Sequence, residues 1–433
     1  MKKKFLVGML AALALTNLVL VVKVFQASAA SDDKEKDSAY ANVALLTRVM
    51  EIVRKDYVDG GGTSYKQLTY SALKGMLNSL DPHSQFMQPD SFDDMRSETE
   101  GQFGGIGIQI GMKDNIITII APMEDTPGWK AGLMPGDKII AVDGTSTDKL
   151  TLPDAVKLLR GKPGSAVTLR ILRSKLKEVK DVKITREIIK IDSVKDAKML
   201  DNKVGYIRVT QFNGPTNEEF EKGLQTLEKQ GMEALIIDLR NNPGGLLESA
   251  VEVAGKFLPR NEMIVYTEGR QVERHIYSAK GNERHPNYPI VVLINGGSAS
   301  GSEIVAGALQ DLKRAVIVGE TSFGKGSVQS VLPLPDGSAI RLTTAKYYTP
   351  GRKVIHEKGV TPDIIVPVTE EDQRALLIQR ARATWGDIGL DEELEKEAKK
   401  LDPKKPVRDV QLDRAIDLLK GIKVYTADKR AQK

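Results

Sequence analysis

The sequence predicts a multidomain α+β protein with an N-terminal helical segment, a compact β module, a layered α/β core and a helical C-terminal tail. Changes in the spacing of apolar residues predict this order. Apolar residues recur at helical spacing up to residue 80, at every second position from Phe103, and in alternating strand-like and helix-like stretches after residue 190. The 433 residues are enough for about two or three domains.

Composition excludes several classes of function. The chain has no cysteine, which rules out disulfides, cysteine-ligated zinc and a cysteine nucleophile. The four histidines form no His-x-x-x-His or His-Glu-x-x-His pattern, so we expect no metal site. The net charge of +5 is spread over both signs without a basic stripe, which argues against nucleic acid as a partner.

Residues 1–30 have the pattern of an export signal. Three lysines follow Met1, an apolar run extends from Phe5 to Val22, and Ala27-Ser28-Ala29 offers a small-x-small cleavage site. The run is at the lower edge of a membrane span, so an uncleaved anchor is the alternative. Either way we expect a periplasmic or other extracytoplasmic protein, tethered to the inner membrane if the anchor is retained.

Residues 31–100 form the N-terminal helical domain in this interpretation. Apolar residues recur at helical spacing between Val43 and Leu80, and the glycines at 60–62 interrupt them. Asp81-Pro82 ends the helical pattern.

The pattern of residues 101–187 predicts a β module of short strands with one helix at 153–159. The stretches Phe103-Gly104-Gly105-Ile106-Gly107-Ile108 and Ala131-Gly132-Leu133-Met134-Pro135-Gly136-Asp137 resemble a PDZ domain. A Gly-rich loop exposes N–H groups that can hold a carboxylate, and the strand after it can pair with a peptide. The resemblance implies that Gly104, Gly105, Ile106 and Gly107 bind the C-terminal tail of a protein. The alternative is that these glycines only turn the chain.

The pattern of residues 188–369 predicts the α/β core, and that of residues 370–433 predicts a charged helical tail. The expected core strands are 204–209, 234–239, 289–294 and 315–319, the expected helices are 216–229 and 246–257, and a hairpin is expected at 328–334 and 339–344.

The stretch 295–302 joins the third of these strands to a helix through a turn rich in glycine and serine. Such a turn places a serine at the positive end of a helix, beside free N–H groups, as an acyl-transfer nucleophile requires. Ser298, Ser300 and Ser302 are the candidates.

A lysine is the candidate base, because no histidine has a context that links it to the serine turn. Lys325 lies between two glycines, and residues 321–335 hold no acidic side chain. To accept a proton near pH 7, its pKa must fall from about 10.4 by roughly 3 units, which requires burial away from carboxylates. The alternative is an exposed loop lysine.

Together with Asp238-Leu239-Arg240-Asn241-Asn242-Pro243-Gly244-Gly245, the serine and lysine motifs resemble the carboxyl-terminal-processing (tail-specific) serine peptidases, from about residue 40 to the end. The resemblance implies a crotonase/ClpP-like core, Ser300 as nucleophile, Lys325 as base and Gln329 as the residue that supports the lysine. At position 301 the family most often has alanine where this chain has glycine.

We expect the oxyanion donors to be the N–H of Gly301 and that of Gly244 or Gly245, although the latter two glycines can also be explained as a turn. Arg160 is a candidate to pair with a substrate carboxylate or with the core, and so to couple peptide binding to activity. A surface arginine without a function is the alternative.

The sequence therefore predicts an exported serine endopeptidase that recognises C-terminal tails through its PDZ domain and needs no cofactor. A non-catalytic PDZ adaptor on a crotonase-like scaffold and an acyl-CoA hydratase-like enzyme are the alternatives. The presence of both Ser300 and Lys325 argues against the first, and the export signal and PDZ module against the second. The sequence leaves open an adaptor or activator protein, a membrane tether and a homo-oligomer.

Overall fold

The computed structural model describes residues 38–431, except 60, 114, 124, 174–177, 271–272, 282–284, 286 and 386–406. The predicted export signal lies outside the described residues. The chain divides into two compact units, Met1–Phe86 and Met87–Lys433. None of the helices in the described ranges combines the length and the apolar character that a bilayer crossing needs.

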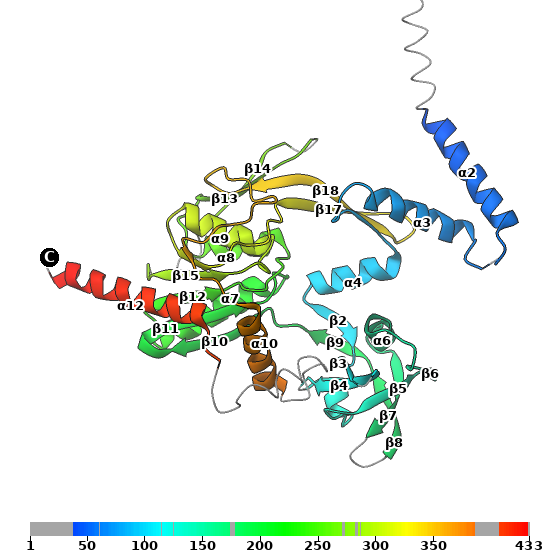
Figure 1. Ribbon diagram of the computed structural model, residues 1–433, viewed down its shortest axis with the longest axis horizontal. Helices are drawn as coiled ribbons and strands as arrows, with labels where there is room; N and C mark the ends of the chain where they lie inside the picture. The colour runs from blue at the N-terminus through cyan, green and yellow to red at the C-terminus, as the bar shows by residue number, and fades with distance from the viewer. Residues whose placement is uncertain are drawn as a thin grey trace, which may run out of the picture. The chain divides into compact units, whose positions relative to one another are not determined.

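The first unit holds two helices, α2 (Ala39–Asp56) and α3 (Tyr65–Asn78) (Figure 1). The short strand β1 (Gln85–Met87) follows and contains the boundary between the units. Ser64 begins α3 with a capping box, in which its hydroxyl accepts the N–H of Gln67 at 3.3 Å. The apolar side chains of α2 are largely exposed, and Val43 is 61% exposed. This helix therefore buries no core of its own.

The second unit begins with α4 (Pro89–Thr99) and the β module (Figure 1). Strand β2 (Gln102–Gly105) pairs with β9 (Glu187–Lys190), and the main sheet of the module has the order β3-β4-β5-β7-β8, with β6 beside β5. Its elements are β3 (Ile108–Lys113), β4 (Ile116–Pro122), α5 (Pro127–Lys130), β5 (Lys138–Val142), β6 (Thr145–Ser146), α6 (Leu152–Leu159), β7 (Ala166–Arg173) and β8 (Glu178–Thr185).

The period-two pattern of the sequence produces the core of this module. Alternate residues of β4, β5 and β7, such as Ile117, Ile139 and Leu169, are buried in one cluster. Strand β3 lies at the edge of the sheet, so its outer side is open to an added strand.

The core domain is built on a six-stranded sheet of order β10-β11-β12-β15-β16-β19, which is parallel from β11 onward. Its strands are β10 (Val194–Leu200), β11 (Val204–Val209), β12 (Ala234–Asp238), β15 (Ile290–Ile294), β16 (Val316–Gly319) and β19 (Ile364–Ile365), and a 3-10 turn, η1 (Asp201–Lys203), precedes β11.

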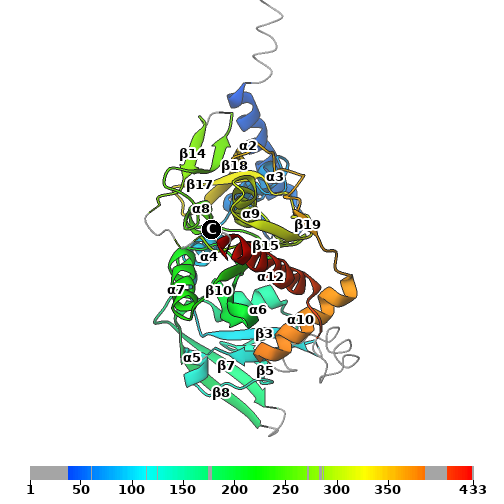
Figure 2. The same cartoon turned by 90° about the vertical axis from the view of Figure 1, so that its left-hand side faces the viewer.

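Helices cover both faces of this sheet. On one face α7 (Thr216–Lys229), α8 (Leu247–Gly255) and α9 (Gly301–Asp311) share a core with Leu235 and Ile237. The other face is covered by α12 (Val410–Ala431) (Figure 2). Ala415 and Leu419 of this helix share a second core cluster with Ile236. Burial on both faces explains why β12 and β15 are continuous apolar runs.

Strands β14, β13, β18 and β17 are hydrogen-bonded in this order as part of a second, five-stranded sheet. Its strands are β13 (Met263–Glu268), β14 (His275–Ser278), β17 (Ser327–Pro333) and β18 (Ala339–Tyr348), and α10 (Glu370–Trp385) follows later in the chain. The sequence predicts the β17–β18 hairpin and misses the β13–β14 hairpin. The predicted fold class, a multidomain α+β protein with a PDZ-like module and a layered α/β core, is confirmed.

Candidate active site

Ser300 lies where the turn after β15 meets the first residue of α9. Its φ of 52° and ψ of −112° are rare for a residue with a side chain. Such strain persists only where surrounding contacts enforce it, and it clusters at functional sites. Here the N–H of Ser300 donates to Glu303 Oε2 at 2.8 Å, which fixes the turn.

The two other serines of the turn are buried, and their hydroxyls are engaged with the backbone. Ser298 Oγ donates to the carbonyl of Leu239 at 2.8 Å, and Ser302 Oγ donates to the carbonyl of Asn242 at 2.9 Å. Ser300, by contrast, is only partly buried. The structure therefore leaves Ser300 as the serine of this turn that a substrate can reach.

Lys325 lies in the loop between β16 and β17 and is partly buried. Burial lowers the pKa of its amine, and the positive charge of Arg341 lowers it further, while the charge of Glu303 acts in the opposite direction. Among the described residues its amine makes no hydrogen bond, to Ser300 or to any other group. Its main-chain N–H donates to Glu303 Oε2 at 2.9 Å.

Glu303 is fully buried and fastens both loops of the site. Its carboxylate accepts the N–H groups of Ser300, Gly324 and Lys325, and also the hydroxyl of Ser322 at 2.5 Å. The expectation of a carboxylate-free lysine site is therefore wrong. The absence of acidic residues from 321 to 335 concerns only the sequence neighbours of Lys325. The carboxylate of the site comes from Glu303 on α9, which is distant in the sequence. The Ser-x-x-Glu spacing at 300–303 is the signal that could have identified Glu303.

Tyr347, on β18, is a second site residue that sequence reasoning missed. Its hydroxyl hydrogen-bonds the carbonyl of Lys325, Glu303 Oε2 and Ser300. Burial and the charge of Glu303 raise the pKa of this phenol well above its ordinary value, so it stays protonated and can donate. No motif in the sequence points to Tyr347, because it is 22 residues from Lys325 on another strand.

Gln329 lies on β17, four residues after Lys325. Its Nε2 donates to Ser327 Oγ at 2.9 Å and to Thr343 Oγ1 at 3.4 Å. Both partners are hydroxyl groups, and the amide Oε1 makes no hydrogen bond to any of the described residues.

The loop after β12 packs directly against the serine turn. An ideal Cβ on Gly244 would lie 2.7 Å from both Ser300 Cβ and the nitrogen of Gly301, and one on Gly245 would lie 1.9 Å from the carbonyl oxygen of Phe212. Both positions therefore require glycine. The N–H of Gly244 donates to Asn242 Oδ1 at 2.8 Å. The N–H groups of Gly245 and Gly301 have no acceptor among the described residues.

In the β module, the Gly-rich loop is held by main-chain contacts. The carbonyl of Gly104 accepts the N–H of Gly161 at 3.1 Å, and that of Ile106 accepts the N–H of Gly128. Gly105 ends β2, and Gly107 has a φ of +69° that favours glycine. The loop leads into β3, the edge strand.

Arg160 follows α6 and points to the segment that enters the β module. Its guanidinium lies 3.8 Å from Asp94 and 3.6 Å from Glu98, both on α4, and 4.6 Å from the centre of the Phe103 ring. Its side chain is 24% exposed. Arg160 thus connects the Gly-rich loop to α4.

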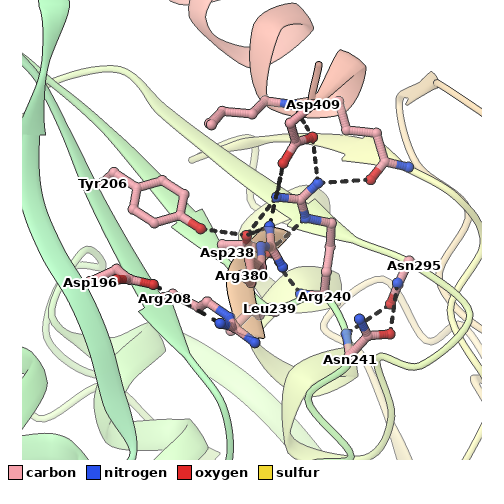
Figure 3. A network of polar contacts seen from close by, with 12 residues as sticks. Asp196, Tyr206, Arg208, Asp238, Leu239, Arg240, Asn241, Asn295, Arg380 and Asp409 are labelled. Atoms are coloured by element: carbon pink, nitrogen blue, oxygen red, sulfur yellow. Dashed lines mark hydrogen bonds and ion pairs between the residues drawn. The ribbon is translucent and has the colours of Figure 1, made fainter. Parts of the chain in front are cut away.

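Behind the site, a buried ion-pair network ties the end of β12 to the C-terminal segment (Figure 3). Arg240 pairs with Asp238 at 2.7 Å and with Asp409 at 2.8 Å, and Arg380 approaches the same two carboxylates. Burial alone would raise the pKa of Asp238, but Arg240 and Arg380 lower it to about 2. Arg240 precedes the Gly244 loop, so the network anchors that loop from behind.

Comparisons with known proteins identify the family of the chain. A model of peptidase family S41 matches residues 203–366, and a PDZ domain model matches residues 118–173. A carboxy-terminal-processing protease of Bartonella bacilliformis is 40% identical over 395 residues, which cover 89% of this chain and 90% of the relative. A carboxyl-terminal-processing protease of Synechocystis is 41% identical over 309 residues, 70% of this chain and 71% of the relative. Among solved structures, a photosystem II D1 C-terminal processing protease matches at 32% identity and a TM-score of 0.45, over 75% of this chain and 92% of that one.

Proposed function

The chain belongs to peptidase family S41 and is a carboxyl-terminal-processing serine peptidase, and from this premise we propose that Ser300 and Lys325 are its catalytic pair. The relatives support a peptidase rather than a non-catalytic adaptor. Ser300 attacks the peptide carbonyl, and the neutral amine of Lys325 takes the hydroxyl proton. The same proton is passed to the leaving amine, and water then hydrolyses the acyl-enzyme.

The residues around this pair supply its support. Gln329 can accept a hydrogen bond from the lysine amine through Oε1 without adding a charge that would keep the amine protonated. The N–H groups of Gly301 and Gly245 serve as oxyanion donors, since neither has an acceptor within the part of the chain that the structure describes. The N–H of Gly244 is engaged with Asn242, and Gly244 contributes by bringing the loop close to Ser300.

We assign tail recognition to the β module. The loop of Gly104, Gly105, Ile106 and Gly107 takes the terminal carboxylate of a protein substrate, and the tail adds to the open edge of β3. Arg160 contacts both Phe103 and α4, and through these contacts it couples binding of a tail in the loop to the rest of the unit. The substrates are flexible or unfolded proteins with free C-terminal tails.

Export is part of the same proposal. The basic, apolar and small-residue pattern of residues 1–30 supports a periplasmic or other extracytoplasmic location, with an inner-membrane tether if the segment is retained. The exposed apolar residues Val43, Leu46 and Val49 on α2 offer a surface for an adaptor or activator protein, or for self-association.

The observation that carries the proposal is that one buried carboxylate, Glu303, holds the main chain of both Ser300 and Lys325. The test is cleavage of unfolded casein by Ser300→Ala, beside Ser298→Ala and Ser302→Ala. We expect Ser300→Ala to lose about a thousandfold or more in kcat. The other two variants lose a buried hydrogen bond and stability, but the folded fraction keeps cleaving. Cleavage by Ser300→Ala at the wild-type rate would place the nucleophile elsewhere.

A further inference from the structure

Two asparagines, Asn241 and Asn295, join the loop after β12 to the turn that carries Ser300 (Figure 3). The loop after β12, residues 239–246, contains Gly244 and Gly245 and is called the oxyanion loop below. The two segments leave β12 and β15, which are parallel neighbours with Asp238 in register with Leu293. Both segments therefore start at the same edge of the sheet. The contacts that hold these two segments together therefore determine the distance between the oxyanion donors and Ser300.

The two side chains form a reciprocal pair. Asn295 Oδ1 accepts the main-chain N–H of Asn241 at 2.9 Å, and Asn295 Nδ2 donates to Asn241 Oδ1 at 2.9 Å. Asn295 Oδ1 also accepts the N–H of Gly297 at 3.1 Å. Because two N–H groups face Oδ1, the orientation of the Asn295 amide is determined, and its NH₂ group must face Asn241.

The pair fixes Asn241, near the start of the oxyanion loop, in an unusual conformation. Asn241 has a φ of +59°, in the left-handed region that asparagine tolerates better than most residues. Farther along, the carbonyl of Asn242 accepts the N–H of Ala299 at 3.0 Å, and Asn242 Oδ1 accepts the N–H of Gly244. The Asn241–Asn295 pair therefore fixes the start of the oxyanion loop. The hydrogen bonds of Asn242 then fix the following residues up to Gly245.

We propose that Asn241 and Asn295 are positioning residues for the oxyanion hole. Neither contacts the reacting atoms. Together they hold the N–H of Gly245 at the place beside Ser300 where the oxyanion forms, and they act as one unit. The proposal rests on the assignment of Ser300 as nucleophile. A shift of about 1 Å in such a donor costs on the order of a hundredfold in rate.

The test is a double-mutant cycle with Asn241→Gly, Asn295→Ala and the double variant. Asn241→Gly removes the side chain but keeps the N–H and the left-handed backbone, so it preserves the fold. Asn261→Gly is the matched control, because Asn261 also has a positive φ, is exposed, and touches neither loop. We expect each single variant to lower kcat at least about tenfold with KM nearly unchanged, and Asn261→Gly to keep the wild-type kcat.

The double variant should be no slower than Asn295→Ala, since the second change finds the pair already broken. A peptide aldehyde, which forms a tetrahedral adduct on Ser300, should lose affinity in step with kcat, while the matching peptide amide should not. The proposal would be overturned if the kcat losses of the two single variants multiplied in the double variant. It would also be overturned if the peptide aldehyde and the peptide amide lost affinity equally. If the aldehyde still inhibits Ser300→Ala fully, the nucleophile assignment fails instead, so the two failures are distinguishable.

Discussion

The main-chain N–H groups of Ser300 and Lys325 donate to the same oxygen atom, Glu303 Oε2, at 2.8 and 2.9 Å. The two residues come from different loops, one before α9 and one before β17. The shared acceptor is 0% exposed, so it joins these two stretches of main chain inside the core. We therefore propose that the main chain fixes the candidate nucleophile and the candidate base relative to each other, an arrangement that can contribute strongly to a catalytic rate.

Replacing Lys325 by methionine should abolish peptide hydrolysis. Methionine keeps the length and apolar stem of the side chain but removes the amine that we propose takes the Ser300 proton, so we expect kcat to fall by about 10⁴. The measurement is cleavage of unfolded casein and of a tail peptide. Lys313→Met, at an exposed position, is the control. Undiminished hydrolysis by Lys325→Met would remove the lysine from the mechanism.

The pH dependence of kcat/KM should show a rising limb from Lys325. Burial and Arg341 lower the pKa of its amine, so the midpoint of the limb should lie below the ordinary value of 10.5. Arg341→Met removes a positive charge that disfavours the protonated amine, so the pKa should rise, the limb should move to higher pH, and the rate at pH 7 should fall. Arg341→Lys keeps the charge and should keep the wild-type midpoint. An unmoved limb in Arg341→Met would contradict this account.

Glu303→Gln should destabilise the protein as well as lower its activity. Two carboxylate oxygens accept four strong hydrogen bonds here, whereas a glutamine has one oxygen and turns an NH₂ group toward N–H donors. We expect a loss of about 3 kcal/mol in the free energy of unfolding, measured in urea. Glu357→Gln, at an exposed glutamate, should change it by less than about 0.5 kcal/mol. Equal urea midpoints for both variants would argue against Glu303 as the shared anchor.

Arg160→Ala should affect substrates according to their C-termini. If Arg160 reports tail binding, the variant should cleave a free-tail peptide several-fold more slowly, toward the rate of the amidated peptide. Arg170→Ala, which removes an exposed pair with Asp181 in the same module, should leave both rates unchanged. The coupling role is lost if both peptides are cleaved by Arg160→Ala at their wild-type rates.

The Asp238 network should make the fold sensitive to acid. Asp238 has a folded pKa of about 2 against an ordinary value of 3.8, a lowered pKa, so its contribution is complete above pH 4 and is lost as the pH falls toward 2. The free energy of unfolding, measured between pH 6 and pH 2, should therefore decline in that window. Asp238→Asn should be less stable at pH 6 and show a shallower decline, while exposed Asp192→Asn should follow the wild type.

The fold and the chemical groups of the site could be predicted from sequence because their signals are local. The helix expected at 216–229 is α7 with the same bounds, and the apolar runs at 204–209 and 289–294 form buried strands. The serines of the 295–302 turn and Lys325 are candidates because each lies in a short glycine-rich turn, and the family resemblance singles out Ser300 among the serines. The β13–β14 hairpin was missed because β14 is exposed or half-buried throughout and has no apolar alternation.

Local sequence patterns indicate the order of the helical, β and α/β segments, the peptidase family and the turns that carry Ser300 and Lys325. The three-dimensional fold brings Glu303 and Tyr347 to those turns and engages the hydroxyls of Ser298 and Ser302 with main-chain carbonyls. It leaves the N–H groups of Gly245 and Gly301 without an acceptor among the described residues. It also brought Asp409 to Arg240 across 169 residues. The physical reason is that a local pattern fixes the conformation of a few neighbouring residues. Which distant groups share one hydrogen-bond acceptor depends on how the strands align and how the loops between them close.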